Sequence, residues 1–253
     1  MLRLEHVTIK FGGLVAVNDL SIHIQKGHIF GLIGPNGAGK TTAFNIITGV
    51  YAPTSGKVIF HGEEIQGARP SMITAKGIAR TYQNINLFKN MSVLDNVMIG
   101  THSRTSANLL SNILNTKSKR MEEQSARSRC LELLDFLGLK ERAQFKASSL
   151  SYGEQRKLEI ARAMAVEPKL LLLDEPAAGM NLTEKDELAE TIRRIRDLGI
   201  TILLVEHNMK LVMNVCEDIC VLNYGSKLAL GTPREIQSDP LVISAYLGGV
   251  TDG

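Results

Sequence analysis

The stretch HIFGLIGPNGAGKTT, residues 28–42, decides the fold. Its first half, 28–33, is an apolar run that can be buried on both faces, which favours a central strand of a parallel sheet. Its second half fits the pattern GxxxxGK[ST], and a helical pattern follows at 41–49. This pattern binds phosphate when it joins a strand to a helix. The sequence therefore predicts a nucleotide-binding loop.

The composition of this loop predicts how the nucleotide is held. Its glycines let the backbone fold around phosphate oxygens, Lys40 supplies a positive charge to the outer phosphates, and Thr41 offers a hydroxyl group to Mg²⁺. The residues expected to contact the nucleotide are Gly34, Asn36, Gly37, Ala38, Gly39, Lys40, Thr41 and Thr42.

Two further apolar runs, at 169–173 and 200–205, are typical of buried strands. Patterns of helical period follow them, at 184–198 and 207–215. This alternation of strands and helices predicts an α/β fold in which helices cover both faces of a central parallel sheet.

The beginning of the chain has a different pattern. Three segments partly alternate in polarity and are separated by glycine and proline, as in antiparallel sheets. We therefore expect a small antiparallel β subdomain formed by residues 2–11, 20–25 and 57–61.

The middle of the chain lacks strand patterns between about 92 and 148. Apolar spacing typical of helices replaces them, which predicts an inserted α-helical subdomain at about 92–148. The core would then consist of residues 1–91 and 149–253. Helices are expected at 93–99, 109–114 and 130–137, and the polar stretch at 101–118 is expected to be a mobile connector or a variable surface helix.

Three polar residues follow the predicted buried strands directly. LLLLDEP places Asp174 and Glu175 after one strand, and ITILLVEH places His207 after the next. Open parallel sheets bind ligands at the carboxyl ends of their strands. We expect Asp174 to reach the Mg²⁺ shell and Glu175 to accept a proton from the water that attacks the γ-phosphate. His207 is expected to hydrogen-bond near that phosphate.

The composition argues against several classes of protein. A chain of 253 residues with 44% hydrophobic content can bury a core, and its net charge of +3 is spread along the sequence, so no nucleic-acid partner is expected. Cys130, Cys216 and Cys220 form no metal-ligand pattern, which favours free thiols in the cytosol. We find no signal peptide and no apolar run of membrane-spanning length, so a role at a membrane would require partner proteins.

A second phosphate-binding element is expected at LSYGEQRK, residues 150–157. Ser151 occupies the cap position of a predicted long helix, beside the small residue Gly153. Such a helix start presents unpaired backbone N–H groups and the positive end of the helix dipole. The sequence thus predicts two phosphate-binding elements in one chain, the loop at 34–42 and the helix start at 150–157.

These motifs together resemble the ATP-binding subunits of ABC transporters, over essentially the whole chain as one domain. The loop at 34–42 resembles the Walker A motif, 150–155 the signature sequence, and 170–175 the Walker B motif with its catalytic glutamate. His207 is similar to the switch histidine of that family. Gln83, in TYQNINLF, is similar to the glutamine that senses Mg²⁺ and joins the helical subdomain to the core.

The resemblance also implies a dimer and ATP as the nucleotide. In that family two subunits pair head to tail, so Ser151, Gly153 and Glu154 of one chain would cap the γ-phosphate held by the other. Phe11 aligns with the aromatic residue that stacks on adenine, although a strand-end core residue is the alternative interpretation.

The sequence departs from the family pattern at two places. The commonest signature has Gly-Gly-Gln where this chain has Tyr152-Gly153-Glu154, so the Glu154 carboxylate must point away from a partner's phosphates to be compatible with them. The D-loop, which follows the Walker B motif, usually ends in Leu-Asp in this family, whereas this chain has Met180-Asn181.

In these departures and in the segment DPLVISAYLGG, the sequence resembles the larger ATPase of branched-chain amino acid importers. That implies two membrane permeases, a second ATPase or a second copy of this chain, a periplasmic binding protein, and a place at the cytoplasmic face of the inner membrane. A urea importer, a lipopolysaccharide exporter, a soluble ABC ATPase and a P-loop kinase are the alternatives.

Overall fold

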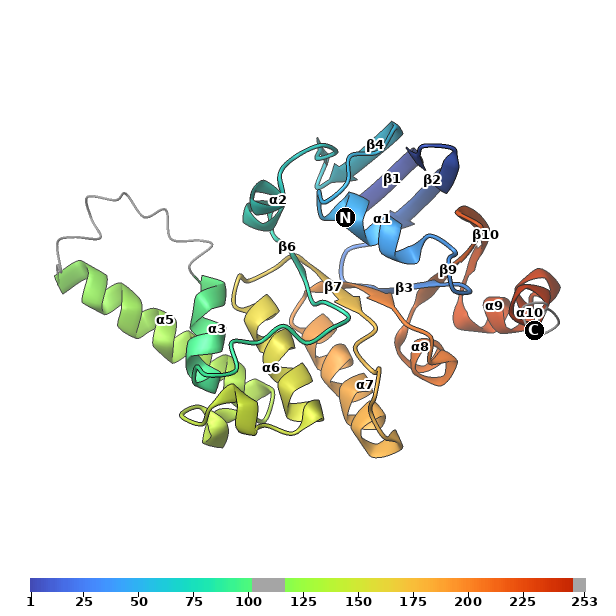
Figure 1. The fold of residues 1–253 in the computed structure, drawn as a ribbon. Coiled ribbons are helices and arrows are strands. Elements are labelled where there is room, and N and C mark those ends of the chain that lie inside the picture. Colours follow the sequence, from blue (N-terminus) through green and yellow to red (C-terminus); the bar gives the residue numbers. More distant parts are fainter. Residues whose placement is uncertain (102–116, 248–253) are drawn as a thin grey trace. The chain divides into compact units, whose positions relative to one another are not determined.

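The computed structural model describes residues 1–101 and 117–247, which form two compact units. The first unit contains residues 1–80 and 169 onward, and the second contains residues 81–168. Figure 1 shows the secondary structure of each unit. The helix expected at 109–114 lies outside the described residues, as does most of the expected connector at 101–118.

The first unit is built on a six-stranded sheet with the order β10-β9-β3-β8-β7-β6. All neighbouring pairs are parallel except β9 and β10, which form an antiparallel hairpin. The three predicted central strands are confirmed, and each begins one residue later than expected. The strands are β3 (Ile29–Ile33), β6 (Ile78–Arg80), β7 (Leu170–Asp174), β8 (Thr201–Val205), β9 (Asp218–Asn223) and β10 (Ser226–Gly231).

The predicted antiparallel layer is also present, as a four-stranded sheet with the order β2-β1-β4-β5. It buries Leu2 and Leu4 of β1 and, beyond an irregularity in the strand pairing, Val7 and Ile9. Its second strand is longer than the expected segment at 20–25, since it begins at residue 14. The bounds are β1 (Leu2–Phe11), β2 (Leu14–Ile24), β4 (Ser55–Phe60) and β5 (Glu63–Glu64).

Helix α1 joins the cores of these two sheets. Its buried residues Phe44 and Ile47 belong to one hydrophobic cluster with side chains of β1, β2, β3, β7 and β8. The phosphate loop that precedes α1 is therefore anchored on both sides. The helices of this unit are α1 (Lys40–Ile47), α2 (Pro70–Lys76), α7 (Leu182–Asp197), α8 (Met209–Val215), α9 (Pro233–Ser238) and α10 (Pro240–Leu247).

The second unit is helical in its described residues. Its helices are α3 (Val93–Thr101), α5 (Lys117–Phe136) and α6 (Tyr152–Met164), with short 3₁₀ turns at Lys140–Arg142 and Ala147–Ser149. The unit extends beyond the expected insert at 92–148, because α6 packs against α3 and α5. The segment that carries Gln83 belongs to it as well. None of the helices in the described part of the chain has the length and apolar content needed to cross a bilayer.

Candidate functional site

The phosphate loop leaves β3 at Gly34 and enters α1 at Lys40. Gly34 and Gly39 have φ angles of 149° and 99°, which side chains disfavour. The space around them is also closed: a Cβ on Gly34 would lie 2.1 Å from the Leu222 carbonyl oxygen. On the same side, the backbone N–H of Gly225 donates to the carbonyl oxygen of Ala38 at 3.1 Å. Glycine is thus required where the loop runs against the β9–β10 hairpin.

Lys40 carries the positive charge of the loop. Its side-chain Nζ donates to the carbonyl oxygens of Gly34 at 2.8 Å and Pro35 at 2.9 Å, and only 6% of the residue is exposed. Burial lowers the pKa of Lys40, and the negative charges of Glu175 and Asp174 oppose this shift. The predicted cation and the two predicted carboxylates therefore lie within electrostatic reach of one another.

Asp174 lies at the carboxyl end of β7, almost fully buried. An ion pair with Arg80 holds it: the guanidinium donates to Asp174 Oδ2 at 2.6 Å and to Asn45 Oδ1 at 2.7 Å. Arg80 also lies over the Phe44 ring, 5.4 Å from its centroid. No motif in the sequence marks this arginine, which fixes the orientation of the Asp174 carboxylate.

Glu175 and His207 meet at the same edge of the sheet. Their strands are paired so that Asp174 lies opposite Val205, which brings the residues that follow them together. The distance from His207 Nε2 to Glu175 Oε1 is 2.8 Å. Glu175 has a φ of 47°, an unusual value for a residue with a side chain, and such strain is concentrated at functional sites. Both side chains therefore lie at the carboxyl ends of parallel strands, as the sequence predicts, and the structure adds their direct contact.

Glu206 supports this pair, and the sequence analysis missed it. Its buried carboxylate accepts backbone N–H groups from Ala177 at 2.6 Å, His207 at 3.0 Å and Asn208 at 3.2 Å. Burial raises the pKa of Glu206, and these hydrogen bonds oppose the shift. A single carboxylate thus joins the turn that follows β7 to the turn that follows β8.

Phe11 is found at the surface. Its side chain is 44% exposed and makes an edge-to-face contact with Tyr51, with ring centroids 5.1 Å apart. This exposure disfavours the alternative that Phe11 is a core residue. Contact of Phe11 with an adenine ring stays a prediction.

The signature segment belongs to the second unit. Ser151 caps α6 in a reciprocal capping box: Ser151 Oγ accepts the Glu154 N–H at 3.3 Å, and Glu154 Oε2 accepts the Ser151 N–H at 2.8 Å. The other oxygen of Glu154 lies 3.4 Å from Nε of Arg142. Gly153 is buried in the first turn of this helix. The Glu154 carboxylate is therefore turned back onto its own unit, as compatibility with a partner's phosphates requires.

Comparison with known proteins places the chain in a family. The family model described as ABC transporter matches residues 17–178, more than half of the chain. The chain belongs to the ABC transporter family. A second model, described as branched-chain amino acid ATP-binding cassette transporter, matches residues 226–252.

Individual relatives of this ABC chain agree with that result. BraF of Pseudomonas aeruginosa, a high-affinity branched-chain amino acid transport ATP-binding protein, is 44% identical over 249 residues and 98% of both chains. LivG of Salmonella typhimurium, which has the same description, is 45% identical over 98% of both chains. The crystal structure of an ABC transporter cassette in its ADP conformation has a TM-score of 0.87 at 32% identity, covering 98% of both chains.

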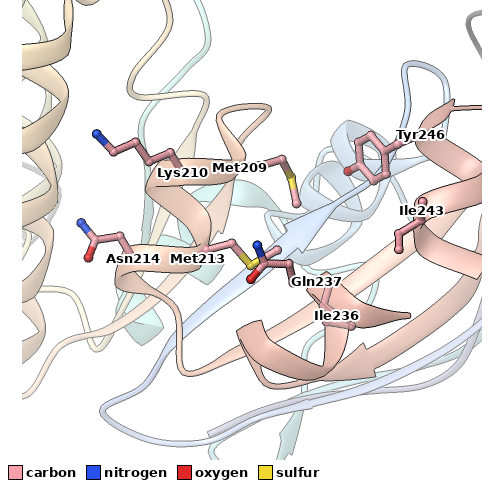
Figure 2. A pocket seen from close by; sticks show the side chains of 8 residues that line it. All are labelled: Met209, Lys210, Met213, Asn214, Ile236, Gln237, Ile243 and Tyr246. Carbon is pink, nitrogen blue, oxygen red and sulfur yellow. The ribbon is translucent and has the colours of Figure 1, made fainter. Parts of the chain in front are cut away.

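A separate groove of about 830 Å³ lies beside α8 in this ABC cassette. Figure 2 shows Met209 and Met213 of α8 facing Ile236, Ile243 and Tyr246 of the C-terminal helices. Burial raises the pKa of Tyr246 to about 12, and a backbone hydrogen bond with Gly34 opposes the shift. The described residues that line the groove include none of those predicted to bind nucleotide.

Proposed function

We propose that this chain is the ATP-hydrolysing motor subunit of a membrane importer for branched-chain amino acids. The observation that carries the hydrolytic part is the convergence of Lys40, Asp174, Glu175 and His207 at one edge of the sheet. The cargo is inferred from the relatives, since BraF and LivG are named as branched-chain amino acid transport proteins and match over 98% of the chain.

ATP would bind at the phosphate loop. The backbone N–H groups at the start of α1 and the ammonium group of Lys40 would neutralise the phosphates. Thr41 and Asp174 supply oxygen donors, a hydroxyl at an exposed position and a carboxylate, which fit the ligand preference of Mg²⁺. When bound, Mg²⁺ would offset charge that develops on the phosphate oxygens.

Hydrolysis would use Glu175 as the acceptor of the proton from the attacking water. His207, at 2.8 Å from Glu175, would hold that carboxylate in place and hydrogen-bond near the γ-phosphate. Arg80 and Glu206 keep Asp174 and this pair in position through the contacts described above.

The dimer and the membrane complex complete the proposal. Ser151 and the backbone of Gly153 would cap the γ-phosphate of a head-to-tail partner, because a serine hydroxyl that accepts one hydrogen bond can still donate another. Gln83 would sense Mg²⁺. The partner is a second copy of this chain or another ATPase, and both would attach to permease subunits at the cytoplasmic face of the inner membrane. A periplasmic binding protein would deliver the amino acid.

The substitution Glu175→Gln tests the hydrolytic part. We expect ATP binding to be retained, because Lys40 and its loop are unchanged, while hydrolysis nearly stops and the dimer stays closed. Glu190→Gln, on the exposed face of α7, is the matched control and should hydrolyse ATP normally. Hydrolysis by Glu175→Gln at the rate of the unmodified chain would rule out Glu175 as the base.

Uptake tests the cargo. Cells that lack this chain are supplied with labelled leucine, isoleucine, valine or urea, and the chain or its Glu175→Gln variant is then restored. Restoration of leucine, isoleucine and valine uptake by the unmodified chain alone is the expected result. Uptake of these three amino acids that does not change in any of the strains would refute the cargo.

A further inference from the structure

The segment that follows β6 leaves the sheet and needs new partners for its backbone. Within the second unit, two side chains of α6 provide them. Arg156 Nη1 donates to the Tyr82 carbonyl oxygen at 2.8 Å, and Arg156 Nη2 donates to the Gln83 carbonyl oxygen at 3.0 Å. Glu159 Oε1 accepts the Tyr82 N–H at 3.2 Å.

The same two side chains also pair with each other. Arg156 Nη1 lies 2.7 Å from Glu159 Oε2, and the two side chains are 0% and 1% exposed. Arg156 Nη2 further contacts the Tyr152 hydroxyl at 3.4 Å. A buried ion pair of this kind is costly unless additional hydrogen bonds satisfy it, and here backbone groups of Tyr82 and Gln83 bind Nη1 and Nη2 of Arg156 and Oε1 of Glu159. The buried charges of Arg156 and Glu159 thus lie where α6 binds the backbone of residues 82–83.

The position of this pair along α6 is informative. Arg156 lies five residues after Ser151, the cap of the helix, on the same rigid element. The pair holds the backbone of Tyr82 and Gln83, so the position of Gln83 depends on α6. Movement of residues 82–83 and movement of Ser151 are therefore mechanically joined through α6.

We propose that Arg156 and Glu159 are positioning residues that make Gln83 and Ser151 move as one piece. This inference rests on the proposed function, in which Gln83 responds to Mg²⁺ and Ser151 caps a partner's γ-phosphate. The Tyr82 N–H and the carbonyl oxygens of Tyr82 and Gln83 are all bonded to side chains of α6. A displacement of the Gln83 backbone should therefore displace α6 and the signature segment at its start. Arg156 and Glu159 contact neither nucleotide nor Mg²⁺ in this scheme and act through Gln83 and Ser151.

The full-length chain with Arg156→Met and Glu159→Leu together tests the proposal. Replacing both members avoids leaving one buried charge unpaired, so the fold is expected to survive. We expect kcat for ATP hydrolysis to fall tenfold or more, with the Kd for ATP within twofold of the unmodified chain. The matched control replaces an exposed ion pair of the same unit, Lys140→Met with Asp135→Asn, and should leave kcat unchanged.

A second comparison separates positioning from a general structural role. In a chain that already carries Gln83→Ala, the Arg156→Met and Glu159→Leu changes should lower kcat no further, because the Gln83 side chain that they position is absent. A further tenfold loss in that background, or a kcat of the double variant within twofold of normal, would overturn the proposal. Should the double variant not fold, Arg156→Lys takes its place; it keeps the charge without the planar fork, and an intermediate kcat is expected.

Hydrogen exchange distinguishes failure of this inference from failure of the proposed function. The Tyr82 amide should exchange at least tenfold faster in the double variant, whatever the chain hydrolyses. Unchanged exchange would overturn the clamp itself. An unmodified chain that does not hydrolyse ATP, with faster exchange in the variant, would refute the proposed function and leave the clamp standing.

Discussion

Replacing Glu206 with alanine removes the acceptor of three backbone N–H groups at once. The Ala177 N–H is buried, and leaving it unsatisfied costs about 1–3 kcal/mol. The other two N–H groups are partly buried and can reach water, so we assign about 1 kcal/mol to each. Part of this loss of stability is offset, because burial of the Glu206 carboxylate raises its pKa and its desolvation no longer opposes folding in the variant. A net loss of about 2 kcal/mol in the free energy of unfolding is expected.

The same substitution should affect catalysis through Glu175 and His207. With the turns after β7 and β8 no longer joined, the 2.8 Å contact between these side chains is expected to be lost, and a misplacement of about 1 Å lowers kcat by about 10²-fold. The affinity for ATP should be nearly unchanged, because Glu206 makes no contact with the phosphate loop among the hydrogen bonds described.

Denaturant unfolding and steady-state ATP hydrolysis at saturating MgATP measure both effects. Glu190→Ala is the control: this exposed residue of α7 forms a surface ion pair with Arg193, and its replacement should change stability by less than about 0.5 kcal/mol. If Glu206→Ala unfolds and hydrolyses ATP as the control does, the reasoning about the carboxylate is wrong.

Three further outcomes are expected. Ser151→Arg should abolish hydrolysis by the dimer and leave ATP binding by the monomer intact, measured by nucleotide titration, because Lys40 is untouched; loss of monomer binding would contradict this. Hydrogen bonds from Ser151 lower the pKa of Glu154, so the stabilising contribution of this carboxylate is present above about pH 4.5 and is lost as the pH falls through the folded pKa. The difference in melting temperature between the chain and Glu154→Gln should therefore shrink from pH 7 to pH 3.5. A constant difference would count against the capping box. Gly34→Ala should prevent ATP binding because its Cβ would meet a backbone carbonyl oxygen, whereas Gly13→Ala, which meets no atom within 4 Å, should bind normally; equal binding by both would refute the steric argument.

The sequence was most informative where a local pattern determines the structure. A run apolar on both faces followed by a polar residue locates Asp174, Glu175 and His207, because the register of parallel strands brings their ends together. The capping box of Ser151 and Glu154 was also readable, since Ser-x-x-Glu at a helix start is its signature. That reading would have predicted that the carboxylate turns back onto its own helix.

Long-range contacts were not readable in this way. Arg80 reaches Asp174 across 94 positions of the chain, and Arg156 reaches the Tyr82 carbonyl oxygen across 74. An arginine in a strand or a helix is usually solvated, and no periodicity marks those that are buried with a partner. Glu206 was missed for a similar reason. It accepts backbone N–H groups, which almost every residue type has, so the identity of the donor residues gives no signal.

The support behind the phosphate loop has a consequence for the synthesis of this chain. The loop runs against the Leu222 carbonyl oxygen and is bonded to the Gly225 N–H, and both of these residues are made long after the loop itself. A ribosome must therefore translate almost two hundred more residues after Gly34 before the loop can acquire its final shape. During that interval the nascent polypeptide carries a phosphate-binding sequence without a phosphate-binding structure, so nucleotide cannot stabilise the folded loop until residues 222–225 have been made.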